Sequence, residues 1–497
     1  MTLAARTLAV WLTPAAWLAV PALVLESGPD GLWVGLLLLV APLLALGLAG
    51  RHSPSAQSRD SLFPVVALLL VVALLFWANL VLAGDVAAWL GAPRWQGIAL
   101  AAGGAWLLIV WRWAGRMVPW LLLAAACGLI VPMIVLARGA GVGPLGAWER
   151  VASLPAFRLP ASSPWVHPGR ELRAGRGPGL MLFEEEHRVT AAGPTQLHVR
   201  AVDGARVNES DWDLRAGESV TLRSGDELRW PPGARLRFEA GKTVPGAPSS
   251  GIVWADGRHG DSPKRWGLLL TLSGGAVALL GFGVAGGVPR RMMAVTGAAL
   301  VAVFAWGVIW AVYCALGAPD LFLGGVAIER LAQPPSLGWA AGTWAAGVGG
   351  FVLVLLPVAG LASFLASSVA LRERIGALDL TGGGEIGHDF GLWSAIIGGA
   401  ALASLWPVEP WLLVIVALGL ATSTLAPAVL WPPPPDRALW GTAAGLVGLV
   451  MFGTLALAGQ WARGSESWAG LPLAYPAMAA APAAAIVLGL ARRPRKG

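Results

Sequence analysis

Long apolar runs separated by short polar turns occupy both ends of the chain, and the middle is polar. Runs of about 20 residues are long enough to cross a hydrocarbon core of about 30 Å as helices. Twelve such runs are present, at 7–25, 31–50, 62–83, 97–115, 117–137, 266–288, 292–317, 338–370, 391–407, 410–431, 439–459 and 471–491. The pattern predicts a polytopic α-helical membrane protein of about 12 transmembrane helices.

The polar middle, residues 138–265, has a different period. Up to residue 180 it is dense in Pro, Gly and Arg, which predicts a linker or an extended arm. Beyond that point, short runs alternate apolar and polar residues between turn residues, at the spacing of a small β-sandwich or barrel. We therefore expect one inserted all-β, sandwich-like domain.

One of these runs, ARLRFEA, indicates which side chains face outward. Leu236 and Phe238 point to one side of a strand, so Arg235, Arg237 and Glu239 point to the other. A register slip of one residue would bury three charges, at a cost of several kcal/mol. The three charged residues are expected to meet solvent or a partner.

Composition supports the membrane assignment. Hydrophobic residues make up 56% of the 497 and charged residues only 13%, which is far from a soluble globular balance. The expected organisation is a five-helix membrane domain at 1–137, an extracytoplasmic linker and β domain at 138–265, and a seven-helix membrane domain at 266–497. The last of these contains a cytoplasmic loop at 371–390.

Basic residues in the short loops predict the orientation, because Lys and Arg are retained on the cytoplasmic side. With the N-terminus inside, only Arg94, Arg330 and Arg463 fall outside. Fourteen fall inside: Arg6, Arg51, Arg59, Arg112, Arg116, Arg290, Arg291, Arg372, Arg374, Arg437, Arg492, Arg493, Arg495 and Lys496. We expect both termini to be cytoplasmic, in the inner membrane of a bacterium. The inside residues account for the net charge of +7, so no nucleic-acid partner is inferred.

The expected spans carry few groups that mark proton paths or hold cofactors. Asp85 and Arg112 lie near span ends, where snorkelling satisfies a charge. None of the six histidines lies in a span to ligate haem, and the two cysteines, Cys127 and Cys314, form no CxxC motif. No cofactor is predicted.

The β domain contains an acidic run, Glu184, Glu185 and Glu186, beside His187 and with His198 further on. Carboxylates and imidazoles are common metal ligands. Successive strand residues point to opposite faces, however, and the spacing matches no strong metal motif. A solvated strand face is the favoured interpretation, and a metal site is the alternative.

The stretch ALDLTGGGEIGHDFG, residues 377–391, is the most unusual loop between two expected spans. It lacks the Lys of a P-loop, and its acids would repel phosphate. Glu385, His388 and Asp389 include the i, i+3 spacing of a helical metal site, but the neighbouring glycines disfavour a helix. The favoured interpretation is a glycine-flexed cytoplasmic connection, either re-entrant or in contact with a partner, and a metal site is the alternative.

Three functions fit this pattern. The first is a non-catalytic membrane scaffold or anchoring subunit of a cell-envelope complex, with the lipid bilayer and other membrane or periplasmic subunits as partners. Its candidate contacts are Arg235, Arg237, Glu239, Glu385, His388 and Asp389. The second is a permease, by analogy of span number alone. The third is a transferase on lipid-linked substrates, using Glu26 and Asp30 of the first external turn.

Overall fold

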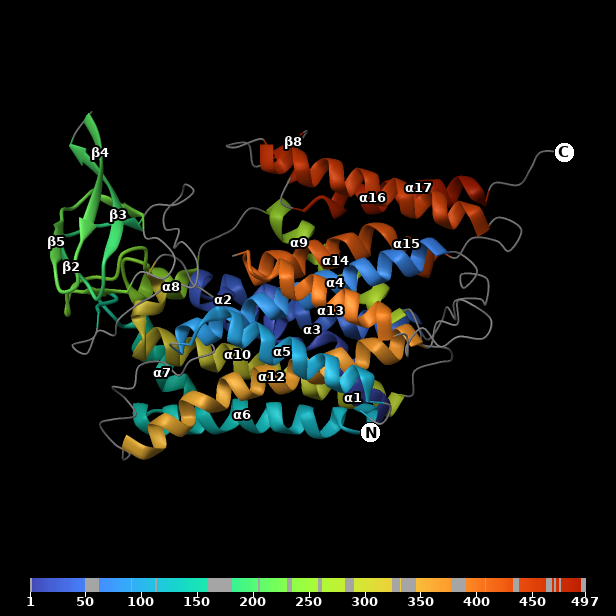
Figure 1. Cartoon of the computed structure of the whole chain (residues 1–497), viewed down its shortest axis with the longest axis horizontal. Helices are drawn as coiled ribbons and strands as arrows, with labels where there is room; N and C mark the ends of the chain where they lie inside the picture. Colours follow the sequence, from blue (N-terminus) through green and yellow to red (C-terminus); the bar gives the residue numbers. More distant parts are fainter. Residues whose placement is uncertain are drawn as a thin grey trace.

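The structure is a computed structural model. It describes residues 2–49, 62–90, 92–111, 114–159, 181–203, 206–229, 235–257, 262–281, 290–323, 331, 346–376, 390–406, 408–431, 438–461, 467–468, 471–472 and 475–492. Of these residues, 74% are helical, and a small β region accounts for most of the strands. Figure 1 shows an elongated helical bundle with the β strands β2 to β5 gathered at one end.

The helices form most of the described chain. In chain order they are α1 (Thr2–Trp11), α2 (Pro14–Ser27), α3 (Asp30–Ala49), α4 (Leu62–Trp89), α5 (Arg94–Val110), η2 (Ala114–Arg116), α6 (Val118–Ala140), α7 (Pro144–Ala152), α8 (Gly251–Asp256), α9 (Ser262–Gly281), α10 (Arg290–Gly317), η3 (Pro319–Phe322), α12 (Ala346–Gly376), α13 (Phe390–Ala403), α14 (Pro410–Thr424), α15 (Ala426–Leu430), α16 (Ala438–Trp461) and α17 (Ala477–Ala491).

Six of the described helices are long and apolar enough to cross a membrane, and the bent pair α1 and α2 makes a seventh if it is one span. Five further helices, α5, α9, α13, α14 and α17, are also apolar, but their apolar segments have only 10–17 residues. These helices are compatible with a multi-pass membrane protein. The expected number of about 12 spans and the orientation stay predictions.

The first expected span, 7–25, is interrupted rather than continuous. α1 ends at Trp11, α2 begins at Pro14, and the two helix axes differ by 59°. Proline suits the first turn of a helix because its missing N–H has no intrahelical partner there. The side chain of Asn79, on α4, accepts a hydrogen bond from the backbone N–H of Ala15 at 3.2 Å and donates one to the Leu75 carbonyl at 2.7 Å. Asn79 therefore satisfies part of the interrupted backbone inside the bundle.

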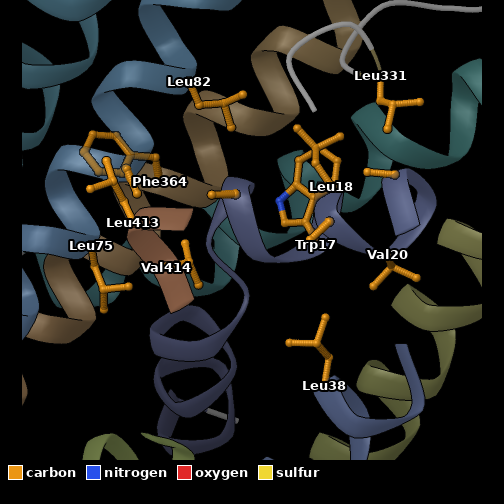
Figure 2. Packing of buried hydrophobic residues seen from close by; sticks show 14 of the residues in the cluster. Trp17, Leu18, Val20, Leu38, Leu75, Leu82, Leu331, Phe364, Leu413 and Val414 are labelled. Atoms are coloured by element: carbon orange, nitrogen blue, oxygen red, sulfur yellow. The ribbon is translucent and has the colours of Figure 1, made fainter. Parts of the chain in front are cut away.

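The interrupted segment lies among the other helices. α2 packs against α10 and α3, and α1 packs against α12. Figure 2 shows Trp17, Leu18 and Val20 of α2 in this interior, with Leu82 of α4 and Phe364 of α12 nearby. Trp17 also meets the ring of Trp306 edge-on, at 5.3 Å between centroids. A large part of the apolar interior is thus built around α2.

The β region consists of β1 (Met181–Leu182), β2 (His187–Ala191), β3 (Thr195–Asp203), β4 (Arg206–Leu214), β5 (Ser219–Leu222), β6 (Glu227–Arg229) and β7 (Leu236–Phe238). These strands form two antiparallel sheets, one in the order β1-β6-β3-β4 and the other in the order β5-β2-β7. We call residues 181–238 of these two sheets the β module. A separate short hairpin joins β8 (Ser467–Trp468) and β9 (Leu471–Pro472).

Apolar residues from both sheets form the interior of the β module. Phe183 follows β1 and stacks on Phe238 of β7, with ring centroids 6.5 Å apart. Leu236 and Phe238 are buried and Arg237 between them is exposed, which is the expected alternation. The alternation arises because successive residues of a pleated strand face opposite sides.

The expected linker 138–180 contains a short helix in its described part. α6 continues to Ala140, and α7 occupies Pro144–Ala152 with Ala147 and Val151 buried one turn apart. This helix was not predicted from the sequence, because it has only nine residues and is surrounded by Gly and Pro. The remaining residues 160–180 lie outside the described part of the chain.

The chain that leaves the β module leads into a packed region of the bundle that we call the joint, made of α7, α8 and the α2–α3 turn. The Trp148 and Trp254 rings lie 5.0 Å apart, and the Nε1 of Trp254 donates a hydrogen bond to the Leu25 carbonyl at 2.8 Å. Gly28 has a φ of +59°, and a Cβ there would overlap the Trp254 carbonyl oxygen. The close approach and the positive φ both require glycine at this turn.

Candidate functional site

The expected partner-contact residues of the β module lie on the outer face of the three-stranded sheet. Arg235, Arg237 and Glu239 are exposed on or next to β7, an edge strand of that sheet. Arg188 on β2 is exposed beside them, since Thr190 pairs with Arg237 in the strand register. This face therefore carries three arginines and one glutamate. Its role in binding stays a prediction.

The outer face of the four-stranded sheet carries a different set of charges, which the sequence reasoning did not identify. His198 Nδ1 lies 2.7 Å from Asp211 Oδ1, and Arg200 bridges Glu227 at 3.0 Å and Glu209 at 3.7 Å. These contacts follow from the pairing of β3 with β4 and β6, which places the residues opposite each other. Opposite charges on directly paired strand residues stabilise a sheet modestly.

The acidic run beside His187 is not arranged as a strand face. Residues 184–186 form the bend between β1 and β2, and Glu185 accepts hydrogen bonds from the backbone and hydroxyl of Thr243. The Thr243 backbone N–H lowers the pKa of Glu185, because it stabilises the charged carboxylate. His187 is on β2 and His198 on β3, in different sheets. Within the described residues, no three metal-ligating side chains gather at one point.

His187 is instead enclosed by the β module. Its side chain is fully buried, its ring meets Phe183 edge-on at 5.1 Å, and neither ring nitrogen has a hydrogen-bond partner among the described residues. Burial lowers the pKa of His187, because the charged imidazolium is disfavoured away from water. The imidazole is therefore held neutral in the folded module at neutral pH.

Glu385, His388 and Asp389 lie outside the described residues, so the structure places none of them. The helix that precedes their loop, α12, carries charged contacts near its end. Glu373 bridges Arg6 of α1 at 2.8 Å, and Arg372 donates a hydrogen bond to the Trp111 carbonyl at 3.1 Å. These contacts tie the end of α12 to α1 and to the end of α5.

Asp85 was expected to reach water by snorkelling, and the structure corrects this. Its side chain is 0% exposed and lies 2.9 Å from the guanidinium of Arg94, whose side chain is 22% exposed. The two residues lie at the end of α4 and the start of α5. Gly97 allows this tight hairpin, because a Cβ there would overlap the Ala83 carbonyl oxygen. A signal was present in the sequence, an acid near the end of one apolar run and an Arg close to the start of the next.

A cavity of about 280 Å³ is lined in part by neighbours of this pair in the chain, including Val86 and Gly97, although neither Asp85 nor Arg94 lines it. Its walls come from four helices, α2, α4, α5 and α12, and consist almost entirely of apolar side chains. Asn79 is the one polar amide in the lining, and its oxygen and nitrogen are both hydrogen-bonded to backbone. Pocket size and lining depend on how helices pack, and the sequence reasoning did not find this site.

The two acids of the first turn are close to the joint. Asp30 begins α3, and a Cβ at Gly257 would lie 3.3 Å from its carboxyl carbon. Glu26 is in the last turn of α2, one residue after Leu25, which Trp254 contacts. Asp30 therefore lies beside the residue that ends α8, whereas Glu26 is exposed on the last turn of α2.

Comparison with known proteins gives no assignment. No protein-family model matches the chain, and no curated protein sequence matches it. The functional proposals below therefore rest on the residues and geometry described above.

Proposed function

We propose that the protein is a non-catalytic membrane anchor of a cell-envelope complex, which holds its β module outside the cytoplasm and binds a partner protein through the outer face of the three-stranded sheet. The observation that carries this proposal is the joint. A module fixed by packed contacts presents its surface in a defined orientation, whereas a module on a flexible tether does not.

The contacts of the joint support a fixed attachment. Besides the Trp254 contacts, a Cβ at Gly251 would overlap the Val151 carbonyl, so α8 lies directly against α7. Phe157 meets the ring of Phe322 in η3 at 5.0 Å. The hydroxyl of Tyr313 in α10 donates a hydrogen bond to the Val142 carbonyl at 2.9 Å. Buried aromatic contacts of this kind order both partners.

The charges of the β module indicate the chemistry of the partner. The outer face of the three-stranded sheet has three arginines and one glutamate, which favours an acidic surface. Arginine is well suited to such a contact, because its planar guanidinium binds carboxylates through two parallel hydrogen bonds. We infer an acidic envelope protein as the partner, and a sandwich-like arrangement of the two sheets that presents this face.

A charge-reversal experiment tests the proposal. The full-length protein is isolated in mild detergent from its native membranes, as wild type and as the double variant Arg235→Glu and Arg237→Glu. We expect the wild type to retain a stoichiometric partner and the variant to lose most of it. The matched control is Arg229→Glu, an exposed residue on β6 of the four-stranded sheet. A single-component particle from wild-type membranes, or equal retention by all three proteins, would contradict the proposal.

A second candidate is a permease for an apolar or lipid-like solute, favoured by the interruption between α1 and α2. Discontinuous helices line the central sites of many transporters. Proteoliposomes containing a fluorescent phospholipid test it through the rate of exchange between leaflets. This candidate predicts an exchange rate above that of protein-free vesicles and a lower rate in Asn79→Leu. Exchange equal to the protein-free rate would remove it.

A further inference from the structure

The cavity between α2, α4, α5 and α12 combines an apolar interior with an exposed rim. Trp17, Leu82 and Phe364, labelled in Figure 2, come from three of its four walls. On the rim, Leu100 of α5 is 66% exposed and Val358 of α12 is 45% exposed. Both helices are apolar, so the rim continues into the surface that faces lipid in a membrane-spanning bundle.

Among the described residues, the lining of the cavity offers no free polar group to a polar solute. The amide of Asn79 is engaged with the backbone of Ala15 and Leu75. Water needs two to four polar partners to occupy a site, so an apolar cavity of this kind stays dry. An empty cavity also deprives its lining atoms of dispersion contacts. A hydrocarbon chain from the surrounding bilayer supplies those contacts without transfer from water.

The charged group beside the cavity indicates which lipid enters. Arg94 is the first residue of α5, four positions after Leu90 and one turn before Gly97, both of which line the cavity. Its side chain is 22% exposed, although Nε and Nη2 are buried and Nη2 lies 2.9 Å from Asp85. A guanidinium at the N-terminus of a 17-residue helix favours a phosphate, through both its charge and the free backbone N–H groups. The cavity extends from this end of α4 and α5 toward Asn79 and Phe364, farther into the bundle.

We propose that the cavity binds one acyl chain of a membrane phospholipid, with the phosphate next to Arg94. Its volume of about 280 Å³ is just below the range for ligand pockets, about 300–1,000 Å³, and suits a single chain rather than a whole lipid. The polar head stays at the rim, and the chain follows the cavity inward. The proposal is independent of the partner-binding and permease functions.

Gly360 offers a direct way to fill the cavity. It lines the cavity, and a Cβ placed on it meets no atom within 4 Å. Gly360→Leu therefore occupies the space that a chain would take, without an overlap in the backbone. The matched control is Gly103→Leu on α5, which also opens onto free space but is not part of the lining. Both substitutions replace a helical glycine by a better helix former, so their effects on helix stability are alike.

The test uses the full chain in vesicles that contain phosphatidylglycerol with a photoactivatable diazirine in the middle of one acyl chain. After illumination, labelled peptides are mapped by mass spectrometry. We expect labelling of cavity residues such as Leu82 and Leu361 to exceed labelling of the outward-facing Leu107 several-fold. Gly360→Leu should reduce the cavity labelling at least about five-fold, and Gly103→Leu should leave it unchanged.

Two outcomes would overturn the proposal. Equal labelling of the cavity residues and Leu107 in the wild type would show only the general lipid shell, and this comparison does not depend on any variant folding. Unchanged cavity labelling in Gly360→Leu would show that the chain lies elsewhere. A diacylglycerol with the same diazirine chain tests the phosphate contact. Weaker cavity labelling by this probe supports the contact with Arg94, and equal labelling contradicts it.

Discussion

The indole Nε1 of Trp254 donates a hydrogen bond to the carbonyl oxygen of Leu25 at 2.8 Å, although the residues are 229 positions apart in the chain. Leu25 lies in the last turn of α2, where carbonyl groups have no intrahelical partner. Trp254 therefore completes the end of α2 and fixes α8 against it. One side chain connects the segment after the β module to the interior of the bundle.

Replacing Trp254 with Phe should destabilise the joint. The substitution removes the donor and leaves the buried Leu25 carbonyl unsatisfied, which costs about 1–3 kcal/mol. Thermal unfolding in detergent, together with proteolysis of the connections around α8, measures the effect. Trp17→Phe is the matched control, because the Nε1 of Trp17 has no hydrogen-bond partner within the described residues. A larger loss in Trp17→Phe than in Trp254→Phe would contradict this account.

The ion pair between Asp85 and Arg94 should behave as a buried pair. Arg94→Met removes the cation beside a fully buried carboxylate and should cost about 3–5 kcal/mol. The double variant Asp85→Asn and Arg94→Met should recover much of that loss, because no buried charge remains at either position. A double-mutant cycle on the unfolding midpoint checks the coupling. Additive effects of the two single changes would show that the pair is not coupled.

The packing of α14 against α16 depends on a glycine. A Cβ at Gly448 would overlap the Ser423 carbonyl oxygen, so Gly448→Ala should force the helices apart. We expect a loss of about 1–3 kcal/mol, measured by thermal unfolding. Gly453, on the same helix, has no atom within 4 Å of an added Cβ. Gly453→Ala should therefore leave stability unchanged or raise it slightly, and an equal loss in both variants would argue against the close approach at Gly448.

His187 should make the β module sensitive to acid. Its folded-state pKa lies below the unfolded value of about 6.5, so protonation favours the unfolded module. The stabilisation is complete above the unfolded pKa and decreases as the pH falls through it toward the folded pKa. The loss is at most about 1.4 kcal/mol for each pH unit between the two.

Hydrogen exchange of β2 in the full-length protein, at pH 7.5 and pH 5.5 and corrected for the intrinsic rate, measures this effect. We expect protection to decrease at pH 5.5 in the wild type. His187→Phe removes the titrating group and keeps an aromatic ring against Phe183, so its protection should change much less. An equal pH dependence in the two proteins would assign the effect to other groups.

The features that follow from local periodicity could be predicted from the sequence. Leu236, Arg237 and Phe238 alternate in burial as the pleat requires, because each position depends only on its neighbours along the strand. Most apolar runs contain a helix, although the run 471–491 begins with β9 and the run 410–431 is divided between α14 and α15. The break between α1 and α2 could not be predicted, because the apolar run continues across Pro14. The hydrogen bond that satisfies the backbone at the break comes from Asn79, 64 positions from Ala15.

The candidate sites depend on contacts between different helices. These contacts could not be predicted from the sequence. Asp85 has the position of a snorkelling residue, and its pairing with Arg94 depends on the close packing of α4 against α5 at Gly97. The cavity is formed by four helices from two separate parts of the chain. The periodicity of side chains predicts which face of each helix is apolar. It does not predict where two apolar faces pack incompletely and leave a cavity.

The interrupted helix has a mechanical consequence. α2 is held at its first turn by Asn79 and at its last turn by Trp254. It therefore connects the interior of the bundle to α8, the helix that follows the β module in the chain. The same helix forms one wall of the cavity through Pro14, Trp17 and Leu18. Because α1 and α2 share no continuous hydrogen-bond ladder across the bend, α2 can tilt without breaking one. One wall of the cavity and the attachment point of α8 therefore belong to the same short helix.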